Sequence, residues 1–128
     1  MELGLALQLT NIIRDVAQDY ANGGRVYLPR EDMDRFGYDV GGLAVARYDD
    51  AFRSLMEFEA LRARELYAAA KAAFPQTDRR SLVAAEIMRR VYERLLDKME
   101  RDGFRVFGPR YRLSRWEKAW CVLRGWLG

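Results

Sequence analysis

Apolar residues recur along most of the chain at spacings of three and four residues, the pattern of helices that bury one face. Glycine and proline interrupt this pattern at intervals, so an almost entirely helical, all-α protein is predicted. The expected helices are, in order, Glu2 to Tyr20, Pro29 to Gly37, Tyr48 to Phe74, Asp78 to Asp102, and Ser114 onward. The segments between them are expected to form a loop or short turn over 39–46 and an extended stretch over 104–113.

Short local signals mark the ends of these helices. Asn22-Gly23-Gly24 and Gly103 are natural helix stops. Thr77 is suited to cap the helix that follows it, and Ser114-x-x-Glu117 is a capping box that opens the last helix. No linker or internal repeat divides the chain, which predicts one domain over residues 1–128.

The first predicted helix carries a narrow polar stripe. At about 100° per residue, its members fall within an arc of about 80°. They are Gln8, Asn11, Asp15 and Asp19. Apolar residues occupy most other sides, which predicts a largely buried helix whose stripe faces an internal cavity. A half-exposed helix with both aspartates in water remains the alternative.

Asp15 and Asp19 form an unfavourable pair within this stripe. Like charges four residues apart repel each other on a helix, and the helix dipole disfavours anions in its second half. No lysine or arginine stands four residues from either aspartate on that face. A divalent cation is therefore the expected compensation.

Composition narrows the chemistry. The 128 residues include no histidine and one cysteine, which excludes Ser-His-Asp catalysis, nearly all zinc sites and an internal disulfide. Cys121 lies in an amphipathic stretch and is expected to be a packing residue. The net charge of +3 does not indicate a nucleic-acid partner. Without a signal peptide or an apolar run of membrane-spanning length, a cytoplasmic location is expected.

Residues 3 to 29 resemble the second aspartate-rich signature of the squalene and phytoene synthase family. There, a Gln-x-x-Asn-x-x-Arg-Asp-x-x-x-Asp helix precedes Gly-Arg-x-Tyr-x-Pro. The matching residues are Gln8, Asn11, Arg14, Asp15, Asp19, Gly24, Arg25, Tyr27, Leu28 and Pro29. Segments 92–97, 102–106 and 110–114 also resemble the carboxyl-terminal region of bacterial members. The resemblance implies part of the class I isoprenoid synthase (terpenoid synthase) helical bundle.

The resemblance also implies roles for individual residues. Asp15 and Asp19 suit a Mg²⁺ site, with Asn11 as a neutral oxygen ligand. The residues expected to approach the substrate diphosphate are Gln8, Arg14, Arg25, Tyr92 and Arg110. Tyr27 is expected to line the cavity near a carbocation, where an aromatic face stabilises positive charge. Without the resemblance, a salt bridge for Arg14, a core position for Tyr27 and an exposed turn for Arg110 remain open.

Members of the family are prenyltransferases that join two identical prenyl diphosphates in a 1′-1, head-to-head manner. The tail from Asp102 to Leu127 looks closest to bacterial presqualene diphosphate synthases of hopanoid pathways. Conversion of farnesyl diphosphate to presqualene diphosphate is therefore expected. Phytoene synthesis from geranylgeranyl diphosphate is the near alternative. The sequence does not indicate NADPH as a cofactor.

One departure from the family concerns the number of aspartate-rich motifs. The family has two, facing each other, and this chain has one; Glu93-x-x-x-Asp97 comes closest to a second but is expected to be a solvated charged face. The chain is therefore expected to be the carboxyl-terminal part of a longer enzyme and to be inactive by itself. The alternative of another class is a binding or assembly module that pairs with a separate chain supplying the missing amino-terminal half.

The last predicted helix has an apolar face on which Trp116, Trp120, Leu123 and Leu127 recur at helical spacing. Such a face is either part of the core or a surface for peripheral association with the inner face of the membrane. A salt-sensitive nucleic-acid surface is the least favoured interpretation.

Overall fold

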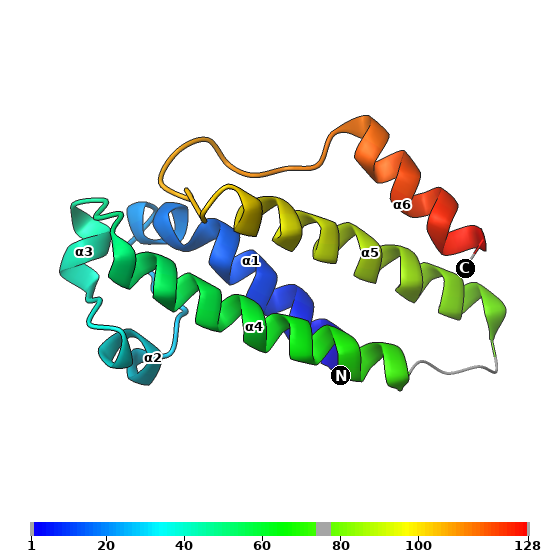
Figure 1. Cartoon of the computed structure of the whole chain (residues 1–128), viewed down its shortest axis with the longest axis horizontal. Coiled ribbons are helices and arrows are strands. Elements are labelled where there is room, and N and C mark those ends of the chain that lie inside the picture. The colour runs from blue at the N-terminus through cyan, green and yellow to red at the C-terminus, as the bar shows by residue number, and fades with distance from the viewer. Residues whose placement is uncertain (1, 74–77, 128) are drawn as a thin grey trace.

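The computed structural model describes residues 2–73 and 78–127, which contain helices and irregular connections but no strands. Its six helices in these ranges are α1 (Glu2–Ala21), α2 (Arg30–Arg35), α3 (Val40–Ala44), α4 (Asp50–Ala72), α5 (Arg79–Arg101) and α6 (Arg115–Leu127) (Figure 1). The all-α prediction is confirmed. The segment expected as a loop or turn contains the short helix α3, because the Asp39 side chain accepts a hydrogen bond from Gly42 N at 2.9 Å and caps it.

The three long helices hold the core. α1 packs against α4 and α5, and α4 also contacts α5, which runs antiparallel to it (Figure 1). Ile13, Phe52 and Leu96 are fully buried where these helices meet. Thr10 and Tyr67 share a 2.7 Å hydrogen bond between α1 and α4, so two buried hydroxyl groups satisfy each other.

Only one side of α1 is covered by the described residues. The buried positions are Ala6, Leu9, Thr10, Ile13 and Val16. Gln8 and Leu5 are exposed, and the two aspartates are partly exposed. The prediction of a helix buried on most sides, with its polar stripe facing an internal cavity, is therefore wrong for the described chain. The helices α4 and α5 pack on the face opposite the stripe, and Arg110 from the segment after α5 reaches the stripe at Asp15.

The expected helix ends largely agree with the structure. Gly24 and Gly103 adopt positive φ angles of 72° and 73°, which favour glycine. The capping box forms as predicted: Ser114 N donates to Glu117 Oε1 at 2.9 Å, and Glu117 N donates to Ser114 Oγ at 3.1 Å. Asp78, whose side chain accepts from Arg80 N, caps α5; Thr77 lies outside the described residues.

Helix α6 returns along the outer side of α5 (Figure 1). Cys121 is buried in this contact, and burial raises the pKa of its thiol. The thiol is therefore held neutral, which agrees with a packing residue rather than a nucleophile. None of the described helices combines the length and apolar character needed to cross a bilayer.

A carboxylic acid is buried in α4. Glu59 is completely inaccessible to solvent, and neither of its oxygens receives a hydrogen bond from a described donor. Burial, together with the neighbouring Asp32 on α2, raises the pKa of Glu59 to about 7. Arg62 lies 2.8 Å from Asp32 Oδ2 and 3.4 Å from Glu59 Oε1. Burial therefore favours the neutral form of Glu59, whereas the hydrogen bonds and charge of Arg62 help to keep the pKa of Asp32 below its usual value.

The wild-type chain is expected to become less stable as the pH rises from 5 to 8, and Glu59→Gln is expected to abolish this pH dependence. Because folding raises the pKa of Glu59 from about 4.5 to about 7, the folded state binds this proton more tightly than the unfolded state does. The resulting stabilisation of the fold is complete below pH 4.5 and is lost as the pH rises to about 7. Between pH 5 and 8, the free energy of unfolding of the wild type should fall by about 1–3 kcal/mol relative to the variant. Urea titrations of both proteins at several pH values measure this. Parallel pH profiles would contradict a raised pKa for Glu59.

Candidate active site

The polar stripe of α1 lies beside the irregular segment that connects α5 to α6. Arg110, on this segment, reaches Asp15 across a separation of 95 residues in sequence. Arg110 Nε and Nη2 donate to the two oxygens of Asp15 at 3.2 and 3.4 Å. The structure thus brings together two residues, far apart in sequence, that the family resemblance assigned to the site.

Asp15 is also held by its neighbour in sequence. Arg14 Nε and Nη2 donate to Oδ1 and Oδ2 of Asp15 at 2.9 and 2.8 Å, a bidentate arrangement. The salt bridge left open for Arg14 is therefore present, and the charge of Asp15 is compensated by two arginines as well as being available to a cation. The helical spacing rule misses both partners, since Arg14 is adjacent in sequence and Arg110 is distant.

The two aspartates consequently differ in their electrostatics. Burial raises the pKa of Asp15, but the hydrogen bonds from Arg14 and Arg110 outweigh it, and the net pKa lies below the usual value. The pKa of Asp19 is raised, first by burial and then by the charge of Asp15, against the opposing effect of Arg25. Asp19 is therefore the carboxylate whose charge the described residues compensate less well.

The donor atoms of the stripe fit a magnesium ion. Asp19 forms no hydrogen bond or ion pair with any described side chain, and Asn11 Oδ1 is buried without a hydrogen-bond donor among the described residues. Hard oxygen ligands of this kind suit Mg²⁺, which uses one or two carboxylates and keeps several waters. No group of three or more acidic, histidine or cysteine side chains that could hold a metal gathers in the described part of the chain.

The other predicted residues are less closely assembled. Tyr92 is partly buried on α5. The pKa of Arg14 is raised mainly by its hydrogen bond to Asp15, and electrostatic interactions with Tyr92 and Asp19 raise it further. Arg25 lies near enough to Asp19 to affect its pKa. Gln8 is exposed on α1, and Tyr27 is 53% exposed after it; no hydrogen bond joins either to the aspartates within the described ranges.

The nearest candidate for a second acidic motif is occupied by ion pairs. Glu93 lies 2.7 Å from Arg89, and Asp97 lies 2.8 Å from Arg64. Both carboxylates are partly exposed. The pair is thus a charged face, as predicted, but its carboxylates are held in ion pairs within α5 and with α4 rather than fully solvated.

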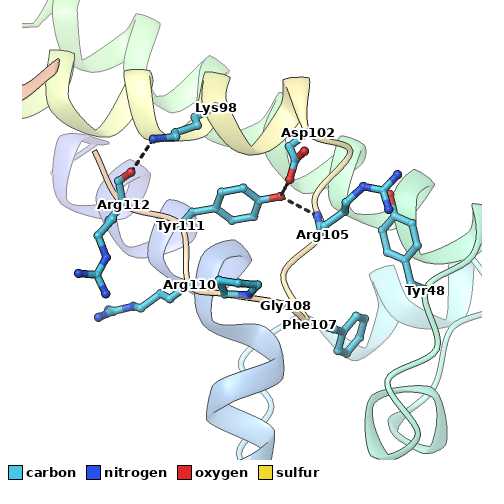
Figure 2. A pocket seen from close by; sticks show the side chains of 10 residues that line it. Tyr48, Lys98, Asp102, Arg105, Phe107, Gly108, Arg110, Tyr111 and Arg112 are labelled. Carbon is cyan, nitrogen blue, oxygen red and sulfur yellow. Dashed lines mark hydrogen bonds between the residues drawn. The ribbon is translucent and has the colours of Figure 1, made fainter. Parts of the chain in front are cut away.

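The sequence analysis did not identify a hollow lined by the end of α5, by Tyr48 and by the segment that carries Arg110. It has a volume of about 630 Å³ (Figure 2). Its lining residues are Tyr48, Lys98, Asp102, Arg105, Phe107, Gly108, Pro109, Arg110, Tyr111 and Arg112. Figure 2 shows the Tyr111 hydroxyl between Asp102 and the backbone N–H of Arg105, which donates to it at 3.0 Å. The cluster of arginines around residue 110 was the available signal.

Comparison with known proteins identifies the family. The squalene/phytoene synthase family matches residues 1–117. The chain belongs to the squalene/phytoene synthase family. The phytoene synthase of Arthrospira platensis is 38% identical over 122 residues, covering 94% of this chain and 38% of the relative. That of Mycobacterium tuberculosis is 38% identical over 123 residues, covering 92% of this chain and 40% of the relative.

The fold agrees with this assignment. The crystal structure of a dehydrosqualene synthase in complex with ligand superposes with a TM-score of 0.86 at 30% sequence identity. It covers 98% of this chain and 44% of that one. The bundle is therefore part of a terpenoid synthase fold, as the resemblance implied, and family members of this kind are prenyltransferases. The chain spans well under half the length of the relatives that it matches.

Proposed function

We propose that this chain is the carboxyl-terminal part of an enzyme that joins two prenyl diphosphates head to head. The observation that carries the proposal is the cluster of Asp15, Arg14 and Arg110 beside the less compensated Asp19. It places acidic and guanidinium groups together, as recognition of a metal-bound diphosphate requires.

The relatives favour one substrate over another. Those described above are named phytoene synthases, which supports geranylgeranyl diphosphate and phytoene better than the farnesyl diphosphate and presqualene diphosphate that the tail suggested. The substrate of this chain is accordingly proposed to be geranylgeranyl diphosphate. The hopanoid assignment rests on the tail resemblance alone.

Within the site, the guanidinium groups have a direct role. Arg14 and Arg110 are proposed to exchange part of their contact with Asp15 for diphosphate oxygens, with Arg25, Tyr92 and Gln8 approaching the same group. Guanidinium forks suit phosphate oxygens as well as carboxylates. The freed Asp15 carboxylate then becomes available as a ligand.

Asp15, Asp19 and Asn11 are proposed to hold Mg²⁺, which supplies neutralisation of the negative charge on a departing diphosphate. Tyr27 is proposed to line the cavity beside the cationic carbon skeleton. The half-exposed ring has room for a hydrophobic chain against it, and its face favours positive charge.

A second aspartate-rich motif must come from outside these 128 residues. We propose that it lies in the remainder of a longer enzyme. A separate amino-terminal chain with which this one assembles is the alternative. In both cases the open face of α1, which carries Leu5 and Gln8, meets the missing part.

The isolated chain is expected to form no phytoene from geranylgeranyl diphosphate and Mg²⁺. A chimera in which it replaces the matching carboxyl-terminal part of the Arthrospira platensis enzyme is expected to form phytoene, because both halves of the site are then present. Product extraction and chromatography measure this, with farnesyl diphosphate as the competing substrate. A soluble, folded chimera that condenses neither substrate would contradict the proposal, and product from the isolated chain would contradict the missing half.

A further inference from the structure

The outward face of α6 is an unusual surface for a water-soluble helix. Cys121 and Gly125 face α5 and are buried. A Cβ at Gly125 would lie 3.3 Å from the backbone N and Cα of Ile87, so the two helices approach closely and α6 is fixed in its rotation. The face opposite this contact is consequently defined by the structure.

That face is apolar and broad. At about 100° per residue, its apolar side chains span an arc of about 160°, centred opposite the buried side. The arc contains Trp116, Ala119, Trp120, Val122, Leu123, Trp126 and Leu127. Trp116 is 86% exposed and Leu127 is 76% exposed. No described residue covers this face, so within the described chain it is a surface.

The charged side chains in and beside this arc are all basic. Lys118 and Arg124 stand at its two edges and are exposed, and Arg124 lies 5.8 Å from the Trp120 ring centroid. Arg115, at the start of the helix, is the one charge within the arc. The single acid of α6, Glu117, faces α5, where it pairs with Lys98 at 3.1 Å. The outward face thus presents basic charge only.

We propose that this α6 face docks on an anionic lipid bilayer. Tryptophan and leucine on one side with lysine and arginine at the edges is the arrangement of a helix that lies in the membrane interface. The aromatic rings insert at the level of the headgroups, while the long basic side chains extend to lipid phosphates. A protein partner with an acidic groove and a second copy of this chain are the competing occupants, and the experiment distinguishes them.

The chain contains its own probe for this surface. All three of its tryptophans, Trp116, Trp120 and Trp126, are in α6. Vesicles of equal parts phosphatidylcholine and phosphatidylglycerol are expected to shift the emission to the blue and to sediment the chain. Vesicles of phosphatidylcholine alone should bind it several-fold more weakly. Arg124→Gln should lower the affinity for anionic vesicles by about fivefold, since each basic residue contributes about 1 kcal/mol near such a surface.

The decisive variant is Trp116→Gln with Trp126→Gln, which keeps Trp120 as the reporter. Binding to anionic vesicles should weaken by more than about tenfold, while circular dichroism stays unchanged because both side chains are exposed. The matched control, Val45→Gln with Leu61→Gln, removes exposed apolar side chains elsewhere and should bind like the wild type.

Three results would overturn the proposal. One is equal vesicle binding by the double tryptophan variant and its control. Another is a blue shift that grows with protein concentration in the absence of lipid, which would identify a second copy as the occupant. The last is a folded full-length chimera that fails to sediment with anionic vesicles, because another part of the enzyme would then cover α6.

Discussion

Asp19→Asn in the active chimera is expected to lower kcat/KM by about 10²–10³-fold, the scale for losing one group that stabilises transition-state charge. Asp19 is the carboxylate without a described ion-pair partner, so its charge is the more available to a cation. Removal of that charge should also raise the Mg²⁺ concentration needed for half-maximal rate. Steady-state kinetics over a Mg²⁺ titration measure both effects.

The control for this variant is Asp34→Asn, which removes the charge of an exposed aspartate on α2. It should leave both the rate and the Mg²⁺ requirement within about twofold of the parent, as surface substitutions usually do. Asp19→Glu should recover part of the rate, because it keeps the charge. Asp19→Asn with an unchanged Mg²⁺ requirement would argue against a metal ligand at this position.

Phe52→Ala is expected to lower the free energy of unfolding of the isolated chain by about 3–5 kcal/mol. The ring is fully buried at the start of α4. Its centroid lies 5.1 Å from that of Tyr38 and 5.0 Å from that of Phe107. Truncation therefore leaves a cavity where three segments meet. The free energy of unfolding of a whole domain is only about 5–15 kcal/mol, so the variant should be close to unfolding.

Urea denaturation followed by far-UV circular dichroism measures this loss. Leu61→Ala on the same helix is the control, because its side chain is 57% exposed and should cost no more than about 0.5 kcal/mol. Similar midpoints for the two variants would show that the aromatic cluster does not hold α4 to the segments on either side of it.

The helices were predictable because their signals are local. Glycine at Gly24 and Gly103, and the box of Ser114 and Glu117, act through residues within one turn. The short helix α3 was missed because its cap, Asp39, precedes a Gly-Gly pair that by itself favours a turn. The exposure of the α6 tryptophans was also beyond sequence patterns, since periodicity identifies an apolar face but not what covers it.

The sequence predicted which residues belong to the site, but it did not predict which of them form ion pairs with each other. The resemblance named Asp15 and Arg110 separately, whereas the contact between them depends on how the segment after α5 folds over α1. The repulsion argument from Asp15 and Asp19 considered neighbours at helical spacing. A guanidinium adjacent in sequence, or one from a distant segment, changes the charge balance without appearing in that pattern.

The contact between Arg110 and Asp15 has a consequence for the order in which the chain acquires its structure. It closes a loop of 95 residues, and the entropic cost of closure must be met before the ion pair contributes. The short-range helices and the packing of α1 on α4 can form first. We expect the contact between Arg110 and Asp15 to form after this packing. A chain cleaved before Arg110 should retain most of its helices, with Arg14 as the remaining described basic partner of Asp15.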